Sequence, residues 1–320
     1  MIPVVMGLFD PLYWLFGNAM RYLYEWIGNY GLVIIVFTVI LRAILIPMFV
    51  KSQKGILKQQ ALQGEVNDIK RVYADDPQTQ QQLTMALYKK NGISTGTSCL
   101  VSLLQLLIII PVFTLFQKPL HYVGGVAAEN IPKIAELVGI ENAKIIARSD
   151  IPIINGLKEH GQALGEAVEK GFMELSQLVD LDFLGIDLGM TPTWKPKLLF
   201  GADTWRTYLP LLILPVLVMI TMFISMRLSR LSLPKGISKE ERERENKNPA
   251  KAGQTPKDSS AGMMKGMNIM MPIIMLFTMF SLPSAMGLYW LFGNIMGIVQ
   301  SLIIYYLYAK PFNEHMESAD

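Results

Sequence analysis

Long runs of apolar residues, separated by polar segments, dominate the pattern along this chain. A helix of about 20 apolar residues is long enough to cross the hydrocarbon core of a bilayer. The pattern predicts five such helices, and therefore an all-α integral membrane protein. The five predicted spans are residues 31–50, 98–117, 207–227, 263–282 and 285–308.

The Lys and Arg residues between the spans predict how the chain crosses the membrane. Residues 51–97 carry seven basic and four acidic residues, and residues 227–262 carry nine basic and five acidic ones. Residues 118–206 are net acidic. Because basic connections tend to stay in the cytoplasm, residues 51–97 and 227–262 are predicted to be cytoplasmic and residues 118–206 extracellular. The N-terminus is then outside the cell, and the tail, residues 309–320, is inside.

The two cytoplasmic connections have different predicted structures. Residues 51–97 predict a helical hairpin, because apolar residues recur at helical spacing and Asp76-Pro77 is a favourable start for the second helix. Residues 228–262 contain few apolar side chains, so they predict a basic, disordered loop.

Two segments are predicted to lie at the outer membrane surface. Residues 1–30 mix aromatic and apolar side chains, which is typical of an amphipathic helix at a membrane interface. The extracellular segment, residues 118–206, contains amphipathic stretches such as 131–138 and 165–178. We expect these stretches to form short helices on the membrane surface.

Composition agrees with a membrane protein and limits its chemistry. The chain has 320 residues, of which 51% are hydrophobic and only 17% are charged, and its mean hydropathy is +0.33. A soluble domain has about a quarter charged residues. The single cysteine, Cys99, excludes a disulfide within the chain, a multi-cysteine metal site and an N-terminal lipoprotein cysteine. The first 20 residues lack Lys and Arg, so the basic region of a signal peptide is missing.

The sequence does not contain the residues that an intramembrane enzyme needs. All three histidines lie outside the predicted spans, and no phosphate-binding G-x-x-x-x-G-K-[ST] loop is present. We therefore expect a protein that is not an enzyme and has no catalytic residue, no metal, no cofactor and no nucleotide.

Arg42 is the only formally charged residue within the apolar runs of the five spans, and no carboxylate there can pair with it. These runs are residues 31–50, 100–117, 208–226, 268–281 and 285–308. Inserting such an arginine costs at least about 2.5–3.5 kcal/mol. It lies nine residues before Lys51, roughly 13 Å along a helix, so its side chain does not fully reach the headgroups. The alternative is a purely structural arginine that extends toward the membrane surface. We favour a charge that water reaches and that waits for a partner on a substrate.

Polar residues recur at helical spacing in three spans and predict a shared hydrated groove around Arg42. Taken singly, each is more typical of an ordinary hydrogen bond between helices, and the groove is predicted from the three stripes together with an unpaired arginine. The predicted groove residues are Arg42, Thr38, Ser102, Gln105, Trp290, Asn294, Gln300 and Ser301. An adjoining apolar surface is predicted from Ile110, Pro111, Met271 and Met275. The methionines of the fourth span either fill a membrane helix or form an adaptable surface for varied apolar partners.

Several stretches together resemble the YidC family of membrane-protein insertases, which includes the oxidase-assembly and albino types. They are "GNYGLVIIVFTVILRAILIPMFVKSQK", "YKKNGISTGTSCLVSLLQ", "FLGIDLG" and "MPIIMLFTMFSLPSAMGLYWLFGNIMGIVQ". They follow the family's order from about residue 28 to 308, and the short architecture is similar to the Gram-positive type. Three positions depart from the usual residues of the family: Ser98 replaces Gly, and Val101 and Leu107 replace Pro.

The resemblance implies an insertase of the bacterial plasma membrane that passes hydrophobic segments of nascent membrane proteins into the bilayer. Arg42 would attract the acidic flank of a substrate, and the apolar part would move into lipid. The implied partners are nascent membrane proteins, membrane lipids, the Sec translocon and the ribosome, whose RNA the basic loop and tail could contact. Two alternatives stay open: an anion-selective transporter or pore that uses Arg42, and a scaffold that assembles membrane complexes.

Overall fold

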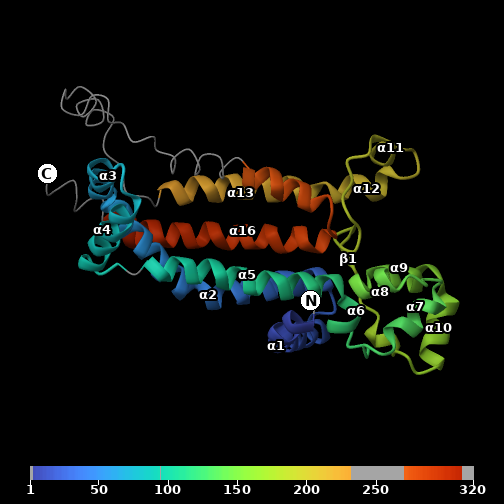
Figure 1. Ribbon diagram of the computed structural model, residues 1–320. Helices are drawn as coiled ribbons and strands as arrows, with labels where there is room; N and C mark the ends of the chain where they lie inside the picture. Colours follow the sequence, from blue (N-terminus) through green and yellow to red (C-terminus); the bar gives the residue numbers. More distant parts are fainter. Residues whose placement is uncertain (1–2, 94, 232–269, 312–320) are drawn as a thin grey trace. The chain divides into compact units, whose positions relative to one another are not determined.

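The structure is a computed structural model that describes residues 3–93, 95–231 and 270–311 (Figure 1). These residues are mostly helical. The chain divides into two compact units. The first contains Met1–Arg42, Leu104–Met219 and Met275–Gly293, and the second contains Ala43–Leu103, Ile220–Ile274 and Asn294–Asp320.

Three helical stretches are long and apolar enough to cross a membrane: Tyr30–Gln59, Trp205–Ser229 and Ser284–Tyr308. The first belongs to α2 (Tyr30–Ala61), the second to α12 (Trp205–Leu211) and α13 (Ile213–Leu231), and the third to α16 (Ser284–Ile304) and the π-helical turn Tyr305–Ala309. The apolar helices at the other two predicted spans are shorter. They are Leu103–Gln117, within α5 (Thr95–Gln117), and Met270–Met279. Residues 263–269 of the fourth predicted span and residues 232–262 of the predicted basic loop lie outside the described residues. The first four residues of that predicted loop, 228–231, instead belong to α13, because the helix continues past the end of the apolar run.

Helix α2 continues 11 residues beyond the predicted end of the first span at Val50. The predicted span ends where the apolar run stops, at Val50. Hydropathy indicates which residues are suited to lipid, but it does not indicate where the helical backbone ends. Lys51 and the Lys and Gln residues after it are good helix formers, so the helix continues into a polar environment.

The predicted pair of helices after α2 is present in the second unit as α3 (Gln63–Val72) and α4 (Pro77–Lys90). The Asp76 carboxylate accepts hydrogen bonds from the Thr79 backbone N–H (3.1 Å) and hydroxyl (2.5 Å), so it caps α4 as predicted. The Gln80 side chain donates to the Tyr73 carbonyl at 2.6 Å and ties the start of α4 to the end of α3.

In the first unit, the extracellular segment of the prediction forms a small helical cluster with its own core. Its helices are α6 (Pro119–Tyr122), α7 (Ile131–Leu137), α8 (Ala143–Arg148), α9 (Ile151–Glu159) and α10 (Gly161–Glu169). Ile134, Ile153, Ile154 and Leu157 are fully buried. The apolar faces of α7, which lies within the predicted stretch 131–138, and of α9 are therefore buried within the unit. That this segment lies on the membrane surface stays a prediction.

The stretch 165–178 is not one amphipathic helix. Helix α10 ends at Glu169, and Gly171 adopts φ +67°, a left-handed conformation that commonly terminates helices. A single 3-10 turn, η1 (Leu175–Gln177), follows. The helical periodicity continues through the sequence, but the glycine interrupts the backbone.

Helix α1 (Pro3–Ile27) has the amphipathic character that the sequence predicts. Phe16 and Met20 are buried, and the Phe16 ring contacts that of Phe37 in α2 edge-on at 5.5 Å. Trp14 and Trp26 are 71% and 94% exposed. Exposed large aromatic rings on a helix that also has a buried face are typical of a membrane-interface helix.

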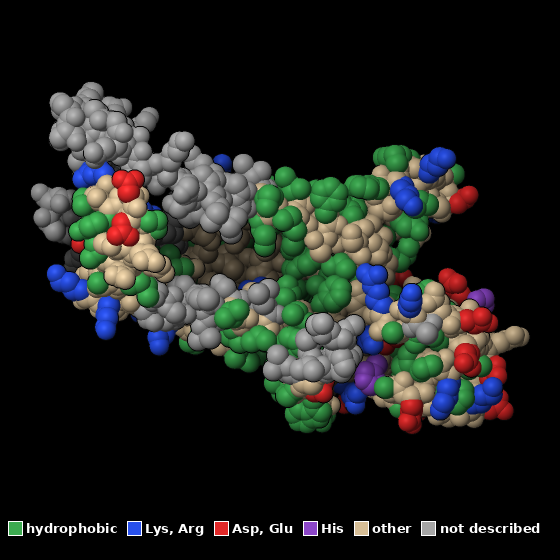
Figure 2. Space-filling view, in the orientation of Figure 1, with side chains coloured by type: hydrophobic (Ala, Val, Ile, Leu, Met, Phe, Trp, Pro, Cys, Tyr) green, Lys and Arg blue, Asp and Glu red, His purple; other side chains and the backbone are tan. Residues whose placement is uncertain are grey.

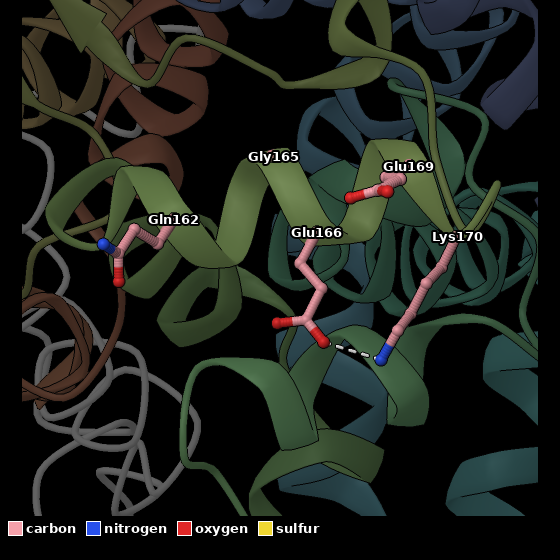
Figure 3. A pocket seen from close by; sticks show the side chains of 5 residues that line it. All are labelled: Gln162, Gly165, Glu166, Glu169 and Lys170. Carbon is pink, nitrogen blue, oxygen red and sulfur yellow. Dashed lines mark ion pairs between the residues drawn. The ribbon is translucent and has the colours of Figure 1, made fainter.

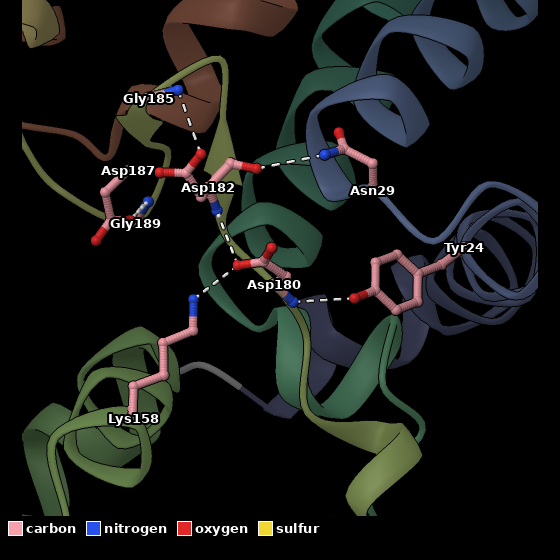
Figure 4. Close-up of polar contacts among 8 residues, drawn as sticks. All are labelled: Tyr24, Asn29, Lys158, Asp180, Asp182, Gly185, Asp187 and Gly189. Carbon is pink, nitrogen blue, oxygen red and sulfur yellow. Dashed lines mark hydrogen bonds and ion pairs between the residues drawn. The ribbon is translucent and has the colours of Figure 1, made fainter.

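A short hairpin connects elements that are far apart in the sequence. Strands β1 (Asp182–Phe183) and β2 (Ile186–Asp187) pair antiparallel, which the all-α prediction did not include. The Tyr24 hydroxyl accepts from the Asp180 N–H at 2.9 Å, and Lys158 pairs with the Asp180 carboxylate at 2.8 Å (Figure 4). Beyond β2, the Leu188 carbonyl accepts from the Ala285 N–H at 2.9 Å. The hairpin thus joins α1, α9 and the start of α16.

Gly31, in the first turn of α2, makes room for this hairpin. A Cβ atom at this position would collide with the ring of Phe183. We expect Gly31→Ala to lower the free energy of unfolding by about 1–3 kcal/mol, the usual cost of overpacking. Thermal unfolding of the purified protein would measure it. Adding Phe183→Ala should recover part of the loss, and an unchanged unfolding temperature in Gly31→Ala would contradict this contact.

Candidate functional site

Arg42 has a hydrogen-bonding partner in the first unit that the charge inventory did not reveal. Its side chain is half-buried and hydrogen-bonds with the side chain of Tyr289 in α16. The sequence predicted an arginine without a partner in the chain. A count of formal charges does not include Tyr289, because a phenol is a neutral hydrogen-bond acceptor. Among the described residues, no carboxylate forms an ion pair with Arg42, so its positive charge stays uncompensated.

Two neighbours fix the position of the Arg42–Tyr289 pair. Tyr289 is 1% exposed, and its ring meets that of Phe116 edge-on, with centroids 5.7 Å apart. One turn further along α16, Gly293 faces the guanidinium, because a Cβ atom there would lie 3.1 Å from Arg42 Nη2. Tyr289 and Gly293 are four residues apart and share a helix face, which was the sequence signal that could have revealed this arrangement.

A larger side chain at Gly293 should displace the guanidinium from Tyr289. We expect Gly293→Leu to lower the free energy of unfolding by about 1–3 kcal/mol, the usual cost of overpacking, because the larger side chain occupies the space of the guanidinium. Gly293→Ala should have a small effect, since a flexible side chain needs to shift by only a few tenths of an ångström. Thermal unfolding of both variants would measure this. An unchanged unfolding temperature in Gly293→Leu would contradict the contact between Gly293 and Arg42.

The other predicted residues of the first unit have different surroundings. Thr38 is fully buried, and its hydroxyl donates to the Ile34 carbonyl of its own helix at 2.6 Å. Gln105 and Trp290 are half-buried, as is Met275. Ile110 is 45% exposed, whereas Pro111 next to it is buried. Their role in a groove stays a prediction.

In the second unit, the polar stripe of α16 faces a matching stripe on α13. Asn294 donates to the Thr221 hydroxyl at 3.3 Å, and the Ser301 and Ser229 hydroxyls lie 3.3 Å apart. Between these contacts, a Cβ atom at Gly297 would lie 3.5 Å from the Ser225 hydroxyl. Thr221, Ser225 and Ser229 recur every fourth residue, which is a helical spacing that the sequence analysis overlooked.

Three further predicted residues belong to the second unit. Gln300 is 7% exposed, and its Nε2 atom has no hydrogen-bond partner among the described residues. Met271 is 60% exposed. Ser102 is part of α5, but its side chain lies outside the described ones.

A depression lies along α10 in the first unit (Figure 3). It is lined by Gln162, Gly165, Glu166, Glu169 and Lys170, all of which are exposed. Glu166 and Lys170 form an ion pair at 2.6 Å, one helical turn apart. Ion pairs of this kind stabilise an exposed helix face by a few tenths of a kcal/mol. This surface is therefore an ordinary solvated one.

Charged and apolar side chains are distributed over different elements. Lys, Arg, Asp and Glu side chains gather over α3 and α4 and over the α7–α10 cluster (Figure 2). In α13, Val216, Ile220 and Phe223 are each about half exposed. Apolar surface of this extent on long helices is suited to lipid. The fold and the site thus define a helical membrane protein with a positive charge held among apolar helices.

Comparison with known proteins identifies the family. Residues 22–311 match the family described as 60Kd inner membrane protein. The chain is similar to proteins named membrane protein insertase YidC. It is 36% identical to that of Caldanaerobacter subterraneus over 101 residues, which are 32% of this chain and 49% of that protein. It is 26% identical to that of Brucella suis over 291 residues, which are 90% of this chain and 35% of that protein. It is also 26% identical to that of Rickettsia africae over 286 residues, which are 89% of this chain and 37% of that protein.

The chain belongs to the YidC family of membrane insertases. It spans at most about half the length of the relatives given above. As a family member with several helices of membrane-spanning length, it is a multi-pass protein of the bacterial plasma membrane.

Proposed function

We propose that this chain is a membrane-protein insertase that receives nascent membrane proteins in a hydrated groove open to the cytoplasm and to lipid. The observation that carries this proposal is the family match over residues 22–311, combined with a single arginine positioned among apolar helices by Tyr289 and Gly293. The proposed topology has five spans, an outside N-terminus and an inside C-terminus.

The proposed mechanism follows from the cost of moving polar groups through hydrocarbon. Transfer of an unpaired amide or hydroxyl into such a medium costs roughly 2–7 kcal/mol, and a carboxylate costs far more. A water-filled groove shortens the dry distance that a polar tail has to cross. The Arg42 charge, which no carboxylate among the described residues neutralises, attracts an acidic tail into the groove. No covalent bond breaks, so the mechanism requires neither a catalytic residue nor a cofactor.

The apolar part of the substrate leaves by a different surface. Ile110 and Met271 are 45% and 60% exposed, so each can contact an apolar segment. Methionine adapts its shape to varied side chains, which suits an exit route for many different sequences. The α3–α4 pair is proposed to receive substrate, and the proposed partners are the Sec translocon and the ribosome.

Reconstitution in liposomes tests the proposal. The substrate is a single-span protein with a short acidic outer tail, and protection of that tail from added protease measures insertion. Efficient insertion in proteoliposomes, and little in protein-free liposomes, is the expected result. Anion flux is measured in the same vesicles. Anion flux without insertion would contradict the proposal and favour an anion-selective pore, for which a single intramembrane arginine is also suitable. If the vesicles show neither insertion nor flux, the remaining alternative is a scaffold that assembles membrane complexes.

A further inference from the structure

A cavity of about 440 Å³ lies in the first unit, beside the end of α5. Its polar lining comes from Lys118, His121 and Tyr122, which follow α5, and from Asp150 just before α9. Its apolar lining includes Ile131 and Ile146. Cavities of this size, with mostly apolar walls and a few converging polar groups, are typical of small-molecule sites.

Asp150 is the unusual group in this cavity. The residue is 1% exposed, Oδ2 accepts the His121 N–H at 2.9 Å, and Oδ1 has no hydrogen-bond partner within the described part of the chain. Among the described residues, no Lys, Arg or His forms an ion pair with it. The Asp150 N–H donates to the Gln117 carbonyl at 3.0 Å, which fixes the carboxyl group against the last residue of α5. A buried carboxyl without a countercharge is costly unless a ligand supplies one.

Lys118 is the only Lys or Arg among the described residues that line the cavity, and a ligand can bind it separately from Asp150. Lys118 is near enough to favour the ionised carboxylate electrostatically, but it forms no ion pair with it. His121 uses Nδ1 for the Val126 carbonyl at 2.7 Å. The Tyr30 and Tyr122 side chains also couple electrostatically with Asp150. The cavity therefore presents an acid and a base that are not paired with each other, next to apolar walls.

We propose that this cavity binds the headgroup of an aminophospholipid, with the ligand's ammonium group at Asp150 and its phosphate at Lys118. A zwitterion with an apolar body complements both unpaired charges and the isoleucine walls. The assignment rests on the proposed topology, in which α5 ends at the outer membrane surface. Lys118 and Asp150 are then at headgroup level, where such a lipid is available.

The protonation of Asp150 predicts how binding depends on pH. Burial raises the pKa of Asp150 to about 7 from its ordinary value of 3.8. The carboxyl group is then about one-tenth ionised at pH 6 and about nine-tenths ionised at pH 8. Because the ammonium group needs the ionised form, we expect about tenfold tighter binding at pH 8.

Titration of the purified, delipidated full chain with phosphoethanolamine tests the site. Its dissociation constant is compared with those of ethanolamine and inorganic phosphate at pH 6 and pH 8. We expect phosphoethanolamine to bind at least tenfold more tightly than either fragment. Asp150→Asn should weaken binding at least tenfold and abolish the pH dependence, and Lys118→Gln should also weaken it. Asn retains an acceptor for the His121 N–H, so the fold is preserved.

Asp187→Asn is the matched control. Asp187 is a half-buried aspartate of the first unit that does not line the cavity, and its carboxylate accepts the Gly189 N–H at 2.8 Å. Its substitution should leave binding unchanged. A wild-type affinity in Asp150→Asn, or equal binding of phosphate alone, would overturn the proposal, because a simple anion site or a buried water would then explain the cavity.

Nanodiscs distinguish a lipid from a soluble ligand. Phosphatidylethanolamine should raise the unfolding temperature of the protein above that in phosphatidylcholine, and Asp150→Asn should remove the difference. If the protein binds soluble phosphoethanolamine but phosphatidylethanolamine does not raise its unfolding temperature, the proposed lipid ligand is wrong. The ligand would then be a free phosphorylated amine. Binding assays need no substrate protein, so a chain that binds the headgroup but inserts nothing would refute only the proposed insertase function.

Discussion

Arg42→Ala is expected to lower insertion of an acidic-tailed substrate about tenfold to a hundredfold. Hydrogen bonds to charged groups contribute about 1.5–3 kcal/mol, and each 1.4 kcal/mol corresponds to a factor of ten. Arg42→Glu should be worse, because it repels the tail. The liposome protease-protection assay measures both variants.

Two controls separate charge from structure. Arg42→Lys keeps the positive charge and should retain most insertion, although lysine lacks the planar fork of donors that arginine offers Tyr289. Tyr289→Phe removes only the hydroxyl, so the arginine keeps its charge but loses its positioning contact, and a smaller, several-fold loss is expected. A substrate with a neutral tail should respond little to any of these changes. Normal insertion of acidic tails by Arg42→Ala would show that hydration of the groove is sufficient.

Asp150→Asn is expected to stabilise the lipid-free protein at pH 8 and to leave it nearly unchanged near pH 4. Burial raises the pKa of Asp150 to about 7, so the folded state binds a proton that the unfolded state releases above pH 3.8. Wild-type stability therefore falls as the pH rises from about 4 through 7. A shift of about three pKa units corresponds to at most roughly 4 kcal/mol. Unfolding temperatures between pH 4 and pH 8 would measure the effect.

Asp180 provides a control of opposite sign. The hydrogen bond from Lys158 lowers the pKa of Asp180, so this carboxylate stabilises the fold above pH 3.8 and loses its effect in acid. Asp180→Asn should therefore slightly destabilise the protein at neutral pH. Parallel pH profiles for wild type and Asp150→Asn would contradict the raised pKa of Asp150.

Much of the helical architecture could be predicted from the sequence, because it depends on local properties. The apolar runs located the three membrane-length helices, and Asp76-Pro77 located the start of α4. Both signals act within a few residues: side-chain hydropathy selects the solvent, and a capping carboxylate satisfies nearby N–H groups. The same patterns did not show that helix α2 continues beyond the apolar run, and they missed the break at Gly171, because neither hydropathy nor helical spacing determines where a helical backbone ends.

By itself, the sequence determined that this is a membrane protein whose apolar helical cores contain one formal charge, and it identified the family through ordered motifs. Only the tertiary structure decided which neutral groups surround that charge. Tyr289 and Gly293 are nearly 250 positions after Arg42, and their contact depends on how two helices pack. Likewise, Asp150 looked like an ordinary surface acid until folding buried it beside Gln117. Composition and periodicity describe each helix separately, whereas burial and pairing depend on the neighbours that the fold provides.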